Sequence, residues 1–258
     1  MVGIARIVGT AFFRALGYYP TKIDGLRFKC DPYHIGWWRL VERGDWEPRT
    51  LGVLSESLKV DSIYCDVGAW IGPTVIFAAR KCKRVYCFEP DPVAYENLLR
   101  NIRLNELRNV MPFNMALTGF DGTCRLATFG KSLGDSMSST IDPGEGKPAT
   151  CVPCMKWETA ERVFGLDAVD FVKIDIEGGE FSLIPSLRDY LLRQRPTVYL
   201  STHAPYLPEC DRLPAMARVV DVMKIYGHCI NEASVHIAVS GLLSKDVLND
   251  FRTFLFKD

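Results

Sequence analysis

The feature that most constrains the fold is the segment from Ser62 to Pro73, which reads Ser-Ile-Tyr-Cys-Asp-Val-Gly-Ala-Trp-Ile-Gly-Pro. Its apolar residues are typical of a buried strand that leads to Asp66, and a turn with Gly68 and Gly72 follows. Pro73 stands where a helix would begin. A glycine turn between a strand and a helix lets a ligand approach backbone N–H groups. The segment therefore predicts a ligand site at the carboxyl end of a strand in an α/β sheet.

A second expected strand ends in an acidic residue, and this residue indicates which kind of ligand binds. Val85-Tyr-Cys-Phe-Glu-Pro-Asp91 is apolar up to Glu89, and a carboxylate at that place can accept hydrogen bonds from ribose hydroxyls. The dinucleotide fingerprint is absent, because Trp70 stands where the second glycine of G-x-G-x-x-G would meet a pyrophosphate. The carboxylate of Asp66 would repel phosphate, whereas it could meet the ammonium group of a methionine moiety, directly or through water. The pattern favours S-adenosylmethionine over a nicotinamide dinucleotide, although Gly72-Pro73 alone is also a plain helix start.

Composition bounds the class of protein without naming a substrate. The 258 residues carry 31 basic and 31 acidic side chains, so no global field favours nucleic acid or an anionic membrane. Nine cysteines and no visible secretory signal predict a reduced cytoplasmic protein. The one C-x-x-C, Cys151 to Cys154, lacks a second pair at zinc spacing and fits an alternating strand.

The chain is expected to form one α/β domain, with residues 1–58 as a mainly helical N-terminal cap and residues 59–258 as the ligand-binding part. Asp24-Gly25 predicts a hairpin turn in the cap. Strands are expected near 62–67, 84–88, 110–115, 169–175, 197–202, 228–232 and 234–240. Helices are expected near 73–82, 92–104, 157–164, 179–193, 212–226 and 244–254. This alternation predicts a mostly parallel sheet with helices on both faces.

Two segments leave alternatives open. Residues 119–150 are rich in Gly, Ser, Thr, Asp and Pro, which predicts an inserted loop that is either a surface insertion or a mobile lid. Met1 to Leu16 has apolar residues at helical spacing, interrupted by Arg6 and Arg14. It is too short and too charged to span a bilayer, so it is either an interfacial helix or, as we favour, a cap helix packed on the domain.

Several blocks between Trp46 and His203 together resemble the FkbM family of S-adenosylmethionine-dependent methyltransferases. The most diagnostic blocks are Phe88-Glu-Pro-Asp-Pro92 and Val172-Lys-Ile-Asp-Ile-Glu-Gly-Gly-Glu180. The others are Trp46-Glu-Pro, Asp66-Val-Gly-Ala-Trp-Ile-Gly72, Asn97-Leu-Leu-Arg-Asn-Ile-Arg-Leu-Asn105 and Asn114-Met-Ala-Leu117. The family usually has Asn where Trp70 stands, and its late Leu-Asp-Asp segment is replaced here by Met155-Lys-Trp-Glu-Thr-Ala160.

The resemblance implies a class I methyltransferase fold, which is Rossmann-like and doubly wound, with a mostly parallel seven-stranded sheet whose last strand is antiparallel. It also implies S-adenosylmethionine as the cofactor. The residues that it assigns to the cofactor are Glu47, Asp66, Gly68, Ala69, Gly72, Glu89, Pro90, Asn114, Ala116 and Asp175. Of these, Glu89 would hold the ribose, Asn114 and Ala116 would line the adenine, and Asp175 would face both the methionine end and the substrate.

A hydroxyl acceptor must lose its proton during methyl transfer, which requires a base or a metal ion. His203 follows the expected fifth strand and lies on the same rim as Asp175, so we expect these two to be catalytic. No metal ligand is assigned, although Asp175, Glu177, Glu180 and His203 would suit a divalent cation in a metal-dependent variant.

The expected acceptor is a hydroxyl of a sugar, a glycan or a small metabolite. Amide and exocyclic-amine methyltransferases often carry Asp/Asn-Pro-Pro-Tyr where this chain has Asp175-Ile-Glu-Gly. That difference and the neutral charge argue against a nucleic-acid acceptor. A non-catalytic module that binds the cofactor or a partner protein is the alternative.

Overall fold

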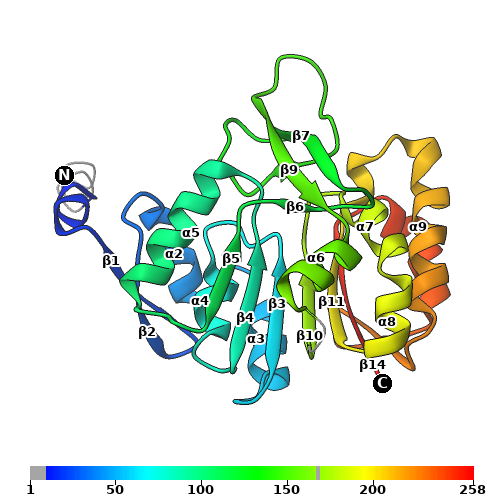
Figure 1. Ribbon diagram of the computed structural model, residues 1–258, viewed down its shortest axis with the longest axis horizontal. Coiled ribbons are helices and arrows are strands. Elements are labelled where there is room, and N and C mark those ends of the chain that lie inside the picture. The colour runs from blue at the N-terminus through cyan, green and yellow to red at the C-terminus, as the bar shows by residue number, and fades with distance from the viewer. Residues whose placement is uncertain (1–9, 167–168) are drawn as a thin grey trace.

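The computed structural model describes residues 10–166 and 169–258, and its centre is one large twisted sheet (Figure 1). Five strands run parallel: β3 (Ile63–Val67), β4 (Arg84–Phe88), β5 (Val110–Phe113), β10 (Phe171–Ile174) and β11 (Thr197–Thr202). Three more extend the sheet beyond β11: β12 (His228–Asn231), β13 (His236–Ile237) and β14 (Arg252–Lys257). The spatial order is β13-β12-β14-β11-β10-β3-β4-β5.

Helices cover both faces of this sheet, as the alternation predicted. They are α2 (Ile35–Arg43), α3 (Pro48–Ser57), α4 (Pro73–Ala78), α5 (Pro92–Leu104), α6 (Trp157–Phe164), α7 (Glu180–Ser186), α8 (Arg188–Gln194), α9 (Glu209–Met223) and α10 (Lys245–Leu248), with short 3₁₀ turns at Ala204–Tyr206 and Val239–Leu243. One core cluster joins Cys65 of β3 to helices α6 to α9, and the other joins Tyr64 of the same strand to helices α2 to α5. Successive residues of β3 thus enter opposite cores, as the two-residue period of a strand requires.

The N-terminal part packs into the second of these cores. The hairpin of β1 (Tyr19–Ile23) and β2 (Leu26–Cys30) turns at Asp24 and Gly25, as expected. Fully buried Trp38 of α2 donates to the Asp31 carboxylate, while the Asp31 backbone N–H donates to the Asn101 side chain on α5. This part is therefore continuous with the sheet through buried hydrogen bonds, and the boundary at residues 58 and 59 stays a prediction.

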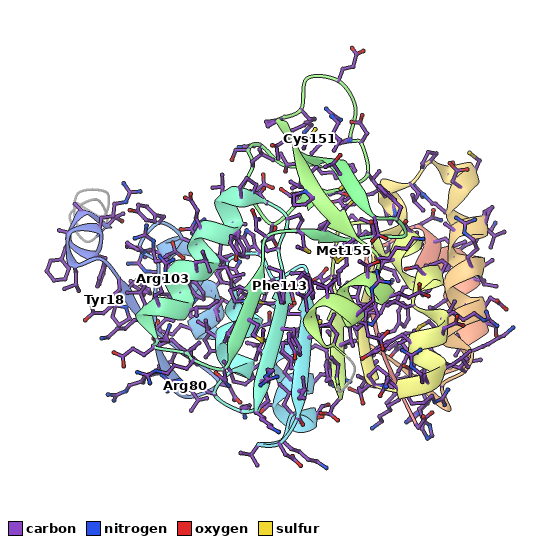
Figure 2. The ribbon with its side chains drawn as sticks, in the orientation of Figure 1. Tyr18, Arg80, Arg103, Phe113, Cys151 and Met155 are labelled. Carbon is purple, nitrogen blue, oxygen red and sulfur yellow. The ribbon has the colours of Figure 1, made fainter. Side chains whose placement is uncertain are left out.

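The expected loop at 119–150 contains two strands that sequence patterning missed, whereas the strand expected at Cys151 to Cys154 is present. β6 (Ala116–Leu117), β7 (Gly122–Thr128), β8 (Ser138–Ser139) and β9 (Ala149–Met155) form a second sheet in the order β6-β9-β7-β8, which projects beyond the large sheet (Figure 1). Figure 2 marks Cys151 on this projection. Cys154 is buried and Cys151 is exposed, so the pair lies on a strand with alternating burial.

The largest correction concerns the end of the chain. Residues 244–254 were expected to be one helix, but α10 ends at Leu248 and β14 follows. β14 inserts antiparallel between β11 and β12, and its Phe254 and Phe256 enter one core while Leu255 enters the other. The sheet has an antiparallel strand as expected, together with the two-residue strand β13, which brings the number of strands to eight.

Candidate cofactor and acceptor site

The glycine turn after β3 is required by close packing. Gly68 has a φ of +88°, and a Cβ added there would lie 1.8 Å from the backbone oxygen of Asp175 on the neighbouring strand end. Gly72 has a φ of +87°, and its Cβ would meet Leu98 of α5 at 2.4 Å. The N–H groups of Gly68 and Ala69 both donate to the Phe88 carbonyl. The turn thus brings β3, β4 and β10 together, and these two N–H groups are already engaged within the protein.

Glu89 is a buried carboxylate held by backbone donors. One oxygen accepts from the Trp70 N–H at 2.7 Å, and the other accepts from the Asp91 N–H at 2.8 Å. Burial raises the pKa of Glu89 to about 8, although these two N–H groups oppose the rise. A carboxyl fixed in this way keeps lone pairs free for hydroxyl donors.

A first cleft of about 550 Å³ of open space lies beside Glu89. Its walls combine apolar side chains with a few polar groups, including Gly68, Phe88, Glu89, Pro90, Met115, Ala116, Leu117, Leu126, Ser138 and Thr140. Apolar walls around one fixed carboxylate fit a nucleoside, whose base is flat and apolar and whose ribose carries hydroxyl donors. Asn114 is absent from this lining, because its amide donates to the carbonyls of Glu89 and Pro90 and so holds the strand end in shape.

Residues 134–139 form a strap that contributes to the lining of this cleft. Asp91 begins α5 and accepts from the N–H groups of Val93 and Ala94 with one oxygen. Its other oxygen accepts from the Gly134 N–H and the Ser138 hydroxyl, both at 2.7 Å. Trp70 stands where the family usually has Asn. Its Nε1 donates to the Gly134 carbonyl at 2.9 Å and so holds the strap in place.

Asp66 lies beneath the site rather than in its wall. It is fully buried, and its carboxylate accepts from the hydroxyls of Tyr64 and Thr74 and from Lys173 Nζ. The expected meeting of Asp66 with an ammonium group is therefore made by a side chain of the protein itself, Lys173. Burial would lower the pKa of Lys173, but Asp66 and then Asp175 raise it, so the ammonium stays charged.

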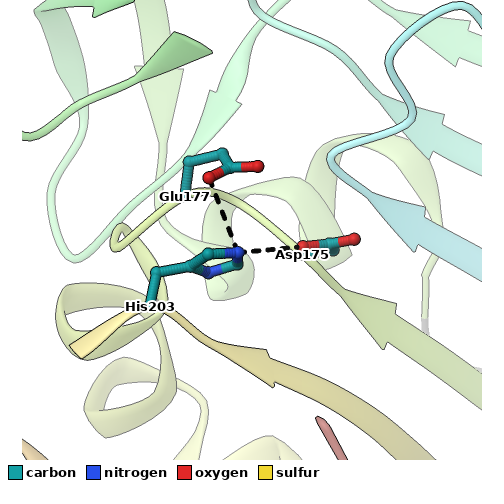
Figure 3. Close-up of side chains that lie close together, drawn as sticks. All are labelled: Asp175, Glu177 and His203. Carbon is teal, nitrogen blue, oxygen red and sulfur yellow. Dashed lines mark ion pairs between the residues drawn. The ribbon is translucent and has the colours of Figure 1, made fainter. Parts of the chain in front are cut away.

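Three side chains converge at the ends of β10 and β11. His203 Nε2 lies 3.5 Å from both an Asp175 oxygen and a Glu177 oxygen, and its Nδ1 lies 3.3 Å from buried Glu180 (Figure 3). Glu177 has a φ of +54°, a backbone conformation that aims its side chain back toward His203. The sequence prediction that His203 and Asp175 share a rim is confirmed by this geometry.

The charges in this cluster bear on the base role that sequence analysis gave to His203, which stays a prediction. Burial would lower its pKa, but Glu180, Asp175 and Glu177 raise it to about 10. A raised pKa favours the imidazolium form at neutral pH, and this form does not act as a base. Burial raises the pKa of Glu177 to about 7, although His203 opposes this. The carboxyl groups are therefore the proton acceptors that the cluster offers.

A second cleft, of about 1160 Å³ of open space, adjoins the first. Both are lined by Gly68, Trp70, Ser136, Asp175 and Glu177, so the converging carboxylates lie at their border. Glu47, expected at the cofactor, lines the second cleft and not the first, so its contact with the cofactor stays a prediction. It accepts from the Thr50 hydroxyl at 2.8 Å, and burial, with Asp175 next, raises its pKa to about 7.

The same three side chains offer the donor set of a cation site. One ligand atom from each of Asp175, Glu177 and His203 lies within 4.8 Å of the others. Carboxylate oxygens with one imidazole suit several divalent metals. A bound cation would compete with the proton on His203, so the metal-dependent alternative and the imidazolium exclude each other.

Sequence reasoning missed Lys173, Glu180 and Arg49. Lys173 is the one charged residue within the buried strand β10. A charged residue in a buried strand is rare, and this rarity could have marked Lys173 as a site residue. Glu180 was named only as a possible cation ligand, whereas its oxygens accept hydrogen bonds from the backbone N–H groups of His203 and Gly178. Arg49 lines the second cleft from α3 and carries no signal in its local sequence.

Comparison with known proteins places the chain in a family of methyltransferases. The family model described as Methyltransferase FkbM domain matches residues 66–228. Among solved structures, an FkbM methyltransferase from Methylobacillus flagellatus KT has a TM-score of 0.47 and 16% identity, with 77% of this chain and 44% of that chain covered. TYW2 from M. jannaschii, solved with AdoMet, has a TM-score of 0.47 and 17% identity, with 93% and 84% covered.

Two curated relatives match parts of the chain. A tRNA (guanine(37)-N(1))-methyltransferase 1 from Vitis vinifera is 36% identical over 94 residues, which are 36% of this chain and 14% of the relative. Methyltransferase sdnD from Sordaria araneosa is 28% identical over 152 residues, which are 46% of this chain and 58% of the relative. The chain thus covers less than two thirds of either relative.

The doubly wound sheet with its glycine turn, together with the family match over residues 66–228, identifies a methyltransferase domain. More particularly, the chain belongs to the FkbM family, because the family model covers most of it. The cofactor of this family is S-adenosylmethionine, and the residues around the first cleft fit its nucleoside. Within residues 10–166 and 169–258, no helix is long and apolar enough to cross a membrane.

Proposed function

We propose that this domain transfers the methyl group of S-adenosylmethionine to a hydroxyl of a sugar, a glycan or a small metabolite. The observation that carries the proposal is the cluster of Asp175, Glu177 and His203 at the border of the two clefts. A nucleoside would occupy the first cleft and the acceptor the second, so the cluster would lie where the methyl group moves.

The cofactor, when bound, supplies an electrophilic methyl group on a sulfonium. The acceptor oxygen forms a bond to that methyl carbon while the carbon–sulfur bond breaks, and the hydroxyl proton must go to the protein. We assign the proton to Glu177, with Asp175 orienting the hydroxyl. Lys173 and His203 hold the pKa of Asp175 below its ordinary value despite burial, so Asp175 stays an acceptor of hydrogen bonds.

His203 then serves as a charged clamp. Its ring contacts both carboxylates and its backbone N–H donates to Glu180, so it fixes the cluster against the repulsion of three acidic groups. Glu89 would bind the ribose, and Gly68, Ala69, Pro90 and Ala116 would contact the cofactor. Asp66, Gly72 and Asn114 would act by holding the neighbouring strand ends in place.

A nucleic-acid acceptor is the second candidate, and one observation favours it. The Vitis vinifera relative is named as a methyltransferase of tRNA, although the match covers only 14% of that protein. Asp175-Ile-Glu-Gly in place of Asp/Asn-Pro-Pro-Tyr and the zero net charge favour the hydroxyl acceptor. The non-catalytic alternative predicts cofactor binding without turnover. A cytoplasmic location is likewise a proposal.

The test uses the purified chain, S-adenosylmethionine labelled on the methyl group, and four acceptor pools: neutral sugars, uronic acids, small hydroxylated metabolites and total tRNA. Label in a hydroxyl-bearing pool, lost in Glu177→Gln, supports the proposal. Label in tRNA alone would replace it with base methylation. Binding of S-adenosylhomocysteine without label transfer to any pool would favour the non-catalytic reading, and absence of binding would refute the cofactor site.

The same assay separates the metal alternative. With the imidazolium in place, turnover should be unaffected by EDTA and by added Mg²⁺. Loss of turnover in EDTA that Mg²⁺ restores would show that Asp175, Glu177 and His203 hold a cation instead.

A further inference from the structure

The second cleft contains two arginines whose Nε atoms lack a partner. Within residues 10–166 and 169–258, the buried side-chain nitrogen and oxygen atoms without a hydrogen bond are Arg49 Nε, Arg252 Nε and Trp157 Nε1. Arg49 and Arg252 both line the second cleft. A buried donor without a partner is costly, so each such atom in a native protein calls for an explanation.

The two arginines differ in how the protein holds them. Arg252 begins β14 and is paired through its terminal nitrogens with Glu232 and Asp250, which fix its guanidinium. Arg49, in the first turn of α3, makes no ion pair or hydrogen bond within the described residues. Its positive charge therefore faces the cleft without a counter-charge of its own.

The acidic groups of the cleft are committed elsewhere. Asp175 is paired with Lys173 and His203, Glu177 with His203, and Glu232 with Arg252. Glu47 accepts from Thr50. A guanidinium left free beside such a network has the planar fork of donors that matches a carboxylate.

We propose that Arg49, with Arg252 as a second donor lining the same cleft, binds a carboxylate of the ligand that occupies the second cleft. Two ligands could carry it: the amino-acid end of the cofactor, or an acidic acceptor such as a uronic acid. The assignment of those two sources rests on the proposed function, whereas the carboxylate chemistry rests on the unpartnered arginines.

The experiment measures binding by calorimetry to the wild-type chain, Arg49→Gln, Arg49→Lys and the control Arg43→Gln. Arg43 is exposed on α2, pairs with Asp45 and lines neither cleft. The probes are S-adenosylhomocysteine, 5′-methylthioadenosine, which lacks the amino-acid end, and methyl glucuronide paired with methyl glucoside.

A loss of at least about tenfold in affinity for S-adenosylhomocysteine in Arg49→Gln, with 5′-methylthioadenosine unchanged, would identify the cofactor as the source. Unchanged S-adenosylhomocysteine binding, with a glucuronide preference lost in Arg49→Gln, would identify the acceptor. In either case Arg49→Lys should retain part of the affinity, and Arg43→Gln should match the wild type.

If Arg49→Gln changes neither S-adenosylhomocysteine binding nor discrimination between glucuronide and glucoside, the inference is wrong. Failure of the wild-type chain to bind S-adenosylhomocysteine contradicts the proposed function separately. The glucuronide comparison still tests Arg49 in that case.

Discussion

The two clefts share a border but are built by different means. The first is shaped by backbone: a glycine turn, strand ends and one carboxylate held by N–H groups. The second is shaped by charged side chains from α3, β10 and β14 and by polar side chains from β11, and these elements lie far apart in the sequence. Because backbone contacts fix the shape of the first cleft, few substitutions there should be tolerated. In the second cleft, a single side-chain substitution could alter which ligand binds.

Of the substitutions considered, Gly68→Ala should disturb the first cleft most. A Cβ there would lie 1.8 Å from the Asp175 oxygen, and the backbone would have to shift at the border of both clefts. We expect affinity for S-adenosylhomocysteine to fall by at least about 100-fold, measured by calorimetry. Gly25→Ala is the matched control, because Gly25 also has a positive φ, of +77°, but no atom within 4 Å of an added Cβ. Equal losses in both variants would refute the packing argument.

Glu89→Gln should weaken cofactor binding by about 10- to 100-fold. The amide cannot accept both the Trp70 and the Asp91 N–H groups, because it presents an NH₂ donor in place of one oxygen. Calorimetric titration with S-adenosylhomocysteine measures the effect, with exposed Glu96→Gln as the control. An unchanged affinity would remove Glu89 from the cofactor site.

His203→Gln tests the second cleft through stability as well as turnover. The folded pKa of about 10 lies above the ordinary histidine value of 6.5, so His203 stabilises the fold fully below pH 6.5 and loses this effect as the pH rises through 10. Removal leaves buried carboxylates without their cation, a cost of about 3 kcal/mol.

Thermal melts of wild type and His203→Gln should therefore differ most near pH 6 and converge near pH 10. His228→Gln, at an exposed position, should follow the wild type throughout. A difference that grows with pH would mean that His203 is neutral in the fold and available as the base.

Ser138→Ala should have the smallest effect. It removes one hydrogen bond to Asp91, worth about 1 kcal/mol, while the Gly134 N–H contact remains. Hydrogen exchange should quicken at residues 134–139, with affinity for S-adenosylhomocysteine changed by less than about threefold. Unaltered exchange there would show that Ser138 does not hold the strap.

The contrast between the clefts also explains what the sequence could predict. β4, α5 and β11 lie where periodicity placed them, and the glycine turn was visible because its cause is local. β14 was missed because Phe254 and its neighbours become a strand only through pairing with β11 and β12. Asp175 and His203 were found because both follow strands, while Arg49 depends on long-range packing that no local pattern records.

The strap at residues 134–139 has a consequence for the order of events in a catalytic cycle. Asp91 anchors the strap through the Gly134 N–H and the Ser138 hydroxyl, and Asp135, Ser136 and Ser138 of the strap line the first cleft. Under the proposed function the acceptor would occupy the adjoining second cleft. We therefore expect the methylated product to leave before the spent nucleoside, and product-inhibition kinetics should reveal this obligatory sequence of release.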